Sequence, residues 1–535
     1  MDCRWKLSVL VWTFVATSAA QVRDARGDEP PSATAVPVDD DAVTRPAPLP
    51  TASPESAPVP AAPVKKSPAK APPKKTPPAF PGPKVLPPTG PYKPLFFDND
   101  FSSKDKPGEP DILGEEAKLM KFELFDTDFV FSTGGELRHR YMNQDNRLQP
   151  GGPGHDTYNL LRWRHYVDLK AGDTFRFYVE GINADSWGED LPIQPTDVNR
   201  WDLLNAFVDV HLFDTDTGSH TLRYGRQELL FGRQRLVSPL DWANTRRNFE
   251  GFRYMVKDKD WKFDAFAVNP VNSATGYRNV FEFDNKFDKA NRDVWFSGTY
   301  FTYTGIENAN LDLYWLWLNN TEPVAGRADG RRHTLGSRYS WLVPIEQERV
   351  WDFDVEGAYQ FGDDDGERVN AGFITAVAGH TWKKALWTPR LSGLAYFGSG
   401  DVDRSDGQTN TFDVLFPLGH AYWALSDNLS GQNLIDLCAQ LEVKPTAKSS
   451  LVGAYHKFRL ASDDDVVYNV AGAPFGTPNN GTDVGDALDV YGYYAFNANL
   501  DIQMGYSWFW YGEFIERTVP RDDASQFYVQ TSLRY

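Results

Sequence analysis

The chain has 535 residues and a formal net charge of −18. The acidic balance and the scarcity of basic clusters in its aromatic-rich part disfavour a nucleic-acid partner. Of its 37 prolines, 21 lie between Pro30 and Pro94, whereas the remainder of the chain carries nearly all the aromatic residues. This uneven composition predicts one folded domain behind one disordered leader.

The N-terminus has the pattern of a secretory signal peptide over residues 1–20. Basic residues precede an apolar run from Leu7 to Ala16, and small residues stand before Gln21. Removal of this peptide takes Cys3 with it and leaves Cys438 alone, so no internal disulfide can form. No later run of 18 apolar residues could cross a bilayer as a helix. The mature protein is therefore either exported and soluble or a membrane-spanning barrel.

Residues 21–95 form a Pro/Ala/Lys-rich linker that is too poor in large apolar groups to fold. At about 3.1 Å per residue it could extend on the order of 200 Å. We expect a spacer, and the alternative is a tether to the cell wall through a lysine patch. That patch comprises Lys65, Lys66, Lys70, Lys74 and Lys75. Residues 96–128 are expected to be a periplasmic segment with one short helix between Asp111 and Lys121.

From Phe129 onward, apolar and polar residues alternate with a period of two, which is the pattern of β-strands. In residues 158–170, apolar side chains such as Trp163 and Val167 share one face, while Arg162 and Asp168 lie on the other. About 18 such segments follow, most of them ten residues or longer, which suits a tilted bilayer crossing.

The connections between these segments alternate between short and long. The short ones are 171–173, 214–219, 257–260, 305–308, 444–448 and 497–499, and the long ones include 143–156, 187–200, 270–292, 400–432 and 461–484. This alternation predicts an all-β fold, a transmembrane up-and-down antiparallel barrel of about 18 strands over residues 129–535. The last segment ends on Tyr535 and resembles the C-terminal signal recognised by barrel-assembly machinery. A soluble sandwich or propeller is the alternative, with shorter strands.

Strand parity predicts which charged side chains face the lumen. We expect the channel to be lined by Glu136, Arg138, Arg140, Arg162, Arg164, Asp168, Arg176, Glu180, Arg223, Arg226, Arg235, Arg247, Arg253, Arg338 and Arg390, with Asp209, Asp264, Asp354 and Glu356 beside them. Guanidinium groups match carboxylates, so this lining favours anionic solutes. In the alternative, the lumenal charges pair with one another and brace an unspecific porin.

Three stretches of the sequence resemble the alginate-export outer-membrane proteins. They are 225–251, with Gly225–Leu229, Phe231–Leu236, Asp241–Asn244 and Arg247–Gly251; Thr411–Pro417 with His420 and Tyr422; and Val484–Asp489 running to Gly505–Ser507. The resemblance implies an 18-stranded barrel whose basic conduit passes an anionic uronate polymer, with Arg226, Arg235 and Arg247 near its constriction. Parity alone does not turn Arg226 inward, so a bulge near Gly225 is expected. Asp486 departs from the family, which usually has a basic residue there.

The other chemical motifs are sparse. Asp401, Asp403 and Ser405 begin like a calcium loop, but Asp406 stands where glycine is required, so we expect a solvated acidic loop. The histidines show no zinc spacing, no cofactor is expected, and no Gly-x-Ser-x-Gly elbow is present. Asp354 and Glu356 could be an acid and base pair, but they share one strand. We therefore predict that the protein is not an enzyme.

Together these patterns predict a channel in the cell outer membrane that passes anionic solutes, including export of a uronate-type polysaccharide. The alternatives are a general diffusion porin and an envelope-tethering barrel protein. The expected partners are anionic polysaccharide or small anionic solutes, outer-membrane lipid and barrel-assembly machinery. The linker could add peptidoglycan or periplasmic export proteins.

Overall fold

The computed structural model describes residues 90–104, 112–149, 152–216, 218–271, 287–322, 329–346 and 348–535. The signal peptide, the lysine patch and most of the linker lie outside these residues, so their predictions stay predictions. No described helix is long and apolar enough to cross a membrane.

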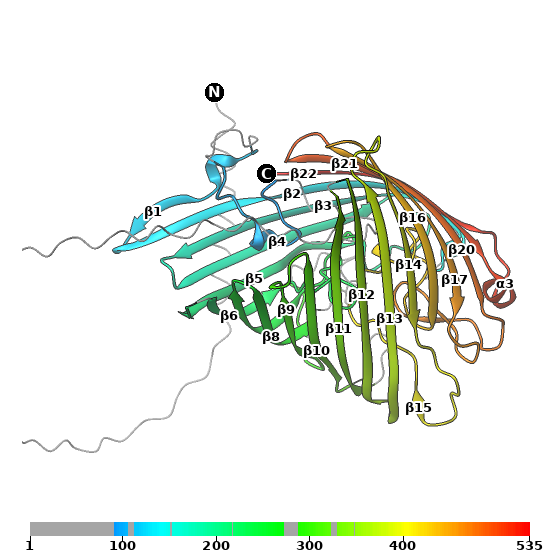
Figure 1. Ribbon diagram of the computed structural model, residues 1–535. Helices are drawn as coiled ribbons and strands as arrows, with labels where there is room; N and C mark the ends of the chain where they lie inside the picture. The colour runs from blue at the N-terminus through cyan, green and yellow to red at the C-terminus, as the bar shows by residue number, and fades with distance from the viewer. Residues whose placement is uncertain are drawn as a thin grey trace, which may run out of the picture. The chain divides into compact units, whose positions relative to one another are not determined.

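In the described chain, twenty strands form one sheet, and eighteen of them close into an antiparallel barrel (Figure 1). The ring closes between β2 (Thr127–Asp145) and β22 (Ala524–Arg534), whose ladder runs from Glu136 opposite Arg534 to Asp145 opposite Ser525. This closure pairs the backbone groups of every wall strand, which a bilayer requires. The predicted fold is confirmed.

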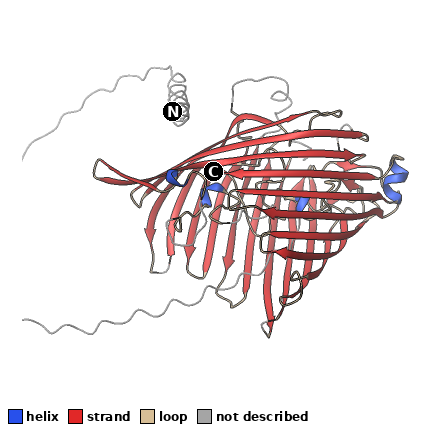
Figure 2. Ribbon diagram, turned by 90° about the horizontal axis from the view of Figure 1, so that it is seen from above, coloured by secondary structure: helices blue, strands red, loops and turns tan. Residues whose placement is uncertain are grey.

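The other barrel strands are β3 (His155–Ala171), β4 (Phe175–Trp187), β5 (Asn199–Asp214), β6 (Gly218–Gln227), β7 (Phe249–Asp258), β8 (Trp261–Pro270), β9 (Val294–Tyr303), β10 (Ala309–Asn320), β11 (Gly330–Ile345), β12 (Arg349–Asp364), β13 (Glu367–Trp382), β14 (Arg390–Gly398), β16 (Leu434–Thr446), β17 (Ser449–Leu460), β20 (Asp483–Ala495) and β21 (Leu500–Tyr511). The short elements are β1 (Met120–Leu124), β15 (Gln408–Thr409), β18 (Val467–Tyr468), β19 (Pro474–Phe475), η1 (Phe96–Asp98), η2 (Glu115–Ala117), η4 (Gly419–Ala421) and α3 (Glu513–Thr518). Figure 2 shows how little helix accompanies the strands.

The two ends of the barrel differ as the sequence predicted. At the turn end, β3 and β4 are joined by three residues and β20 and β21 by four, whereas at the loop end β14 and β16 are separated by residues 399–433. In a barrel of this kind the short turns face the periplasm. The predicted helix before β1 is smaller than expected, because only Glu115–Ala117 forms a 3-10 turn.

Burial alternates along each wall strand. In β14, for example, every second residue is buried, with Arg390 and Ser392 inward and Leu391 outward. Outward residues such as Leu437 and Met504 are about half exposed, as lipid-facing side chains are when no lipid is present. The outer face therefore forms the apolar surface of a membrane barrel.

The β1–β2 hairpin extends the wall at the turn end (Figure 1). β1 pairs with β2 from Met120 opposite Phe131 to Leu124 opposite Thr127, below the level where β22 ends. The rings of Phe122 and Phe129 stack 5.2 Å apart. Apolar residues thus continue the outer surface of the barrel along this projection.

Candidate functional site: the interior of the barrel

Two chain segments from the loop end enter the barrel. We call residues 228–248, between β6 and β7, the first lumenal segment, and residues 410–433, between β14 and β16, the second lumenal segment. In the first segment, the ring centre of Phe231 lies 4.9 Å from that of Tyr300 on β9, and the ring centre of Trp242 lies 4.9 Å from that of Tyr528 on β22. Since β9 and β22 lie on distant parts of the ring, this segment crosses the interior.

The second lumenal segment packs against both the wall and the first segment. The Leu425 amide donates to Asp489 on β20 over 2.9 Å. The main chains of the two segments exchange hydrogen bonds at Phe416, whose amide donates to Leu236 and whose carbonyl accepts from Ser238, each over 2.9 Å. The lumen is therefore occupied by folded chain.

A buried cluster of charges lies where the first lumenal segment meets β2 and β3. Arg162 lies 2.7 Å from Glu136 and 2.8 Å from Asp241, and Arg246 also pairs with Asp241 and with Glu228. Burial alone would raise the pKa of the Asp241 carboxyl, but the charges of Arg246, Arg162 and Arg138 hold it well below its usual range. Asp241 is therefore an anion that fixes the segment to the basic wall.

Arg138 and Arg140 differ from the other buried wall arginines, because in the described chain neither has a carboxylate within ion-pair distance. Arg138 donates to the main-chain oxygens of Asp241 over 2.7 Å and Ala243 over 2.6 Å. Arg140 donates to Gln530 over 2.6 Å, and its guanidinium carbon lies 3.6 Å from the ring centre of Trp242. Two buried cations are thus held by neutral partners, most of which belong to the first lumenal segment.

Most other predicted lining residues form ion pairs with inward carboxylates of neighbouring strands or, for Arg390 on β14, of the next strand but one, β12. These are Arg164 with Glu180 (2.6 Å), Arg176 with Asp168 (2.8 Å), Arg223 with Asp209 (2.6 Å), Arg253 with Asp264 (2.7 Å), Arg338 with Asp354 (2.5 Å) and Arg390 with Asp352 (2.5 Å). Opposite charges that lie opposite or diagonal to each other on one face stabilise a strand pair, and Arg223 lies directly opposite Asp209. These pairs have the arrangement that the porin alternative anticipated.

The three arginines that the family resemblance singled out lie in different surroundings. Arg235 lies 3.0 Å from Asp354 and 2.5 Å from Glu356. Arg247 donates to the Pro417 carbonyl over 3.2 Å and so links the two lumenal segments. Because Asp354 and Glu356 are both bound by Arg235, neither is poised as a free acid or base.

Arg226 is buried as the resemblance implied, but not through a bulge. The ladders of β6 with β5 and β7 pass Gly225 without a register shift. Instead Gly225 has φ +133° and the glycine opposite it, Gly251, has φ +155°. Such angles favour glycine, and they turn Arg226 towards Glu250, 3.6 Å away.

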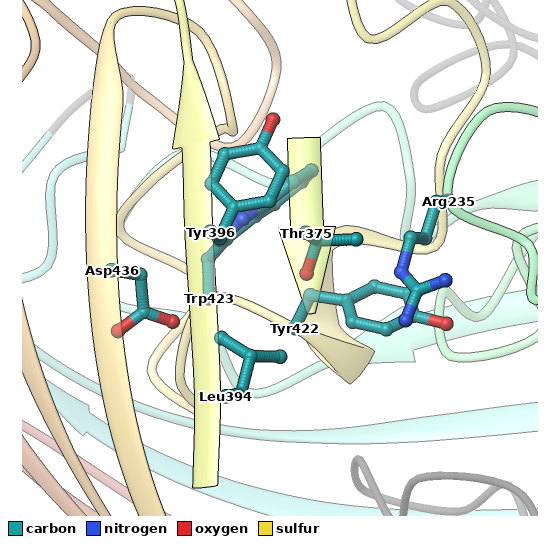
Figure 3. A pocket seen from close by; sticks show the side chains of 7 residues that line it. All are labelled: Arg235, Thr375, Leu394, Tyr396, Tyr422, Trp423 and Asp436. Atoms are coloured by element: carbon teal, nitrogen blue, oxygen red, sulfur yellow. The ribbon is translucent and has the colours of Figure 1, made fainter. Parts of the chain in front are cut away.

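A small cavity lies between the two lumenal segments and the wall (Figure 3). It is lined by Arg235, Thr375, Leu394, Tyr396, Tyr422, Trp423 and Asp436. The cavity volume open to the centre of a water-sized sphere is about 10 Å³, which is room for about one water molecule. The cavity is therefore too small for a sugar ring while both segments are in place.

The predicted acidic loop at the loop end forms hydrogen bonds within itself and with the loop that follows β17. Asp403 accepts from the Ser405 amide over 3.0 Å, and the Asp401 amide donates to Asp465 over 3.0 Å. Within the described ranges, no group of three or more His, Cys, Asp or Glu side chains could hold a metal ion.

Sequence reasoning missed two parts of this interior. Arg246 was not singled out, because strand parity gives no orientation for a residue in an irregular segment. Phe96 and Phe97 were also missed, although two adjacent phenylalanines directly after a Pro/Ala-rich stretch are an unusual signal. Both phenylalanines are buried inside the turn end of the barrel.

Comparisons with known proteins agree with this fold. Solved structures similar to this chain include the outer membrane protein OprD from Pseudomonas aeruginosa, with 13% identity and a TM-score of 0.50 over 75% of this chain and 93% of that one. OccD3 (OpdP) from the same organism is 11% identical, with a TM-score of 0.51 over 78% of this chain and 93% of that one. OccAB1 from Acinetobacter baumannii is 11% identical, with a TM-score of 0.50 over 76% of this chain and 96% of that one. At these identities the likeness shows the fold alone.

The search of curated proteins gave no match. The sequence does match the alginate export family over residues 129–529, which spans the whole barrel wall up to β22. The family and the barrel together make this an outer-membrane channel protein. The resemblance read from its motifs is thereby confirmed: the chain belongs to the alginate export family.

Proposed function

We propose that this channel passes anionic solutes along its arginines, and that its substrate is a uronate-type polysaccharide leaving the cell. The observation that carries the proposal is the pair Arg138 and Arg140. Their guanidinium groups are buried, and their partners are main-chain and amide oxygens and an indole ring. A carboxylate is a stronger acceptor for guanidinium than a neutral oxygen, so an anion could displace these partners.

The first lumenal segment supports the same proposal through its charge. It contains four arginines, Arg233, Arg235, Arg246 and Arg247, against the two acids Glu228 and Asp241. The segment therefore carries a net charge of about +2 into the lumen. A basic segment against a basic wall gives an anion cationic groups on both sides.

Planar-bilayer recordings test this proposal. We expect the ratio of chloride to potassium permeability to fall towards unity in an Arg138→Gln/Arg140→Gln variant, and block by added oligouronate to weaken. The control is Arg349→Gln/Arg368→Gln, which removes the same charge from two exposed positions. Equal selectivity in the native protein and both variants would contradict an anion conduit at this pair.

A general diffusion porin is the second candidate. It is favoured by the ion pairs between wall strands, such as Arg223 with Asp209 and Arg390 with Asp352, which leave little net charge on that part of the wall. This candidate predicts that neutral sugars pass as fast as uronates of the same size. Liposome swelling with glucose and glucuronate of equal concentration distinguishes the two.

A further inference from the structure

The N-terminal residues 90–104 cross the turn end of the barrel and insert two aromatic side chains. Phe97 packs edge-on against Phe207 at 5.3 Å and Tyr178 at 5.7 Å, and Phe96 lies 5.9 Å from Tyr166. Tyr166, Tyr178 and Phe207 are inward residues of β3, β4 and β5. The two phenylalanines are 3% and 4% exposed, so they occupy the interior and not its rim.

This segment contacts the arginines of the turn end in two ways. The guanidinium carbons of Arg164 and Arg223 lie 4.1 Å and 4.6 Å from the ring centres of Phe96 and Phe97. Arg176 donates to the Phe97 carbonyl over 2.6 Å, and Arg246 to the Pro94 carbonyl over 3.2 Å. The segment thus presents aromatic faces to Arg164 and Arg223 and main-chain oxygen acceptors to Arg176 and Arg246. A sugar acid would offer carboxylate oxygens, which are stronger acceptors for the same guanidinium groups.

The backbone of the segment takes no part in the strand ladders of the barrel wall. In the described chain, no residue of 90–104 belongs to a strand of the sheet. Besides the bonds from Arg176 and Arg246, its polar anchors include the Tyr92 hydroxyl, which accepts from Asn499 over 2.9 Å, and Lys104, which donates to the Lys118 carbonyl over 2.8 Å. Withdrawing these residues would break no wall ladder, so the barrel could stay closed without them.

We propose that residues 90–104 are a removable plug at the turn end, which competes with anionic solute for Arg164, Arg176, Arg223 and Arg246. The proposal rests on the proposed anion conduit for the identity of the solute, but not for the closure itself. With the plug in place, the phenylalanines block the entrance, and the guanidinium groups of Arg176 and Arg246 donate to its main-chain oxygens as well as to carboxylates of the barrel interior. With the plug withdrawn, the same groups face the periplasm.

The test compares the full-length protein with a Phe96→Ala/Phe97→Ala variant in planar bilayers. We expect the fraction of time open to rise about tenfold or more, because losing two buried aromatic side chains weakens the closed state by more than a tenfold change in population requires. The matched control is Phe122→Ala/Phe129→Ala, which removes an aromatic pair from the outer surface. A folded plug variant that conducts like the native protein would overturn the proposal.

Adding the plug back gives a second measurement that does not depend on the fold of the variant. A synthetic peptide of residues 90–104 should block the Phe96→Ala/Phe97→Ala channel from the turn side, and a peptide with both phenylalanines replaced should not. Equal block by both peptides would also overturn the plug.

The failure of the plug and the failure of the anion conduit are distinguishable. Anion selectivity without a rise in open time means that the conduit stands and the plug is wrong. A rise in open time without anion selectivity means that the plug stands and the assignment of its competitor to anions is wrong.

Discussion

The rings of Trp242 and His420 stack 3.4 Å apart and within 6° of parallel, which joins the two lumenal segments inside the barrel. Asp427 completes the contact, since its carboxylate accepts from Trp242 Nε1 over 2.7 Å and lies 2.9 Å from His420 Nδ1. This stacked pair adds to the main-chain hydrogen bonds that hold together the two segments that fill the lumen.

We expect acid to open the channel, because protonation of His420 weakens the contact that joins the two lumenal segments. Burial lowers the pKa of His420 below its ordinary value despite the opposing charge of Asp427, and Arg140 and Arg147 lower it further. The packed state therefore binds fewer protons than the released state, so its stability is present at neutral pH and is lost as pH falls below about 6.5. Open time recorded from pH 7.5 to 5 should rise on acidification.

His420→Phe is the matched variant for this prediction, because it keeps an aromatic ring against Trp242 and removes the titrating group. Its open time should change less between pH 7.5 and 5 than that of the native protein. An acid response of the same size in both proteins would assign the effect to other groups.

Removal of the Arg235 side chain should destabilise the barrel. Arg235→Gln leaves Glu356 and Asp354 with fewer compensating charges, and breaking a buried pair costs about 3–5 kcal/mol. Urea unfolding in detergent, followed by tryptophan fluorescence, measures the loss. In the double variant Arg235→Gln/Glu356→Gln one uncompensated carboxylate is gone, so part of the stability should return.

The glycine pair behind Arg226 can be tested by adding one methyl group. In Gly225→Ala the new Cβ would lie against the Ala206 carbonyl oxygen and 2.8 Å from Phe207 Cα, and the φ of +133° is strained for alanine. We expect a loss of about 1–3 kcal/mol or more in the free energy of unfolding. Gly453→Ala is the control, because nothing lies within 4 Å of its Cβ position.

Asp197, in the loop before β5, makes the stability of the barrel depend on pH in the opposite sense to His420. Burial raises the pKa of its carboxyl to about 7 against the charge of Arg147. The folded state therefore binds more protons than the unfolded state between about pH 4 and 7, so stability falls as pH rises through that range. The free energy of unfolding of the Asp197→Asn variant should exceed that of the native protein by a few kcal/mol at most at pH 8, and by little at pH 4. Thermal unfolding at the two pH values measures this difference.

The wall of the barrel could be predicted in detail from the sequence. Period-two alternation set the inward and outward faces, and the positions of turns such as 171–173 agree with the structure, because a strand has only two faces and a short turn fixes its register. The burial of Arg138 and Arg162 follows from the same rule. Parity failed at Arg226, where two opposed glycines in unusual conformations turn the backbone without any shift of register.

By itself, the sequence determined the membrane-barrel fold, the family and the inward direction of the wall arginines, since each depends on local periodicity or on a contiguous motif. Only the tertiary structure decided what fills the lumen and which groups those arginines bind. Trp242 meets His420 and Arg176 meets Phe97 across long separations in the chain. Irregular segments have no period that fixes the direction of their side chains, so their contacts arise only when the closed wall brings them together.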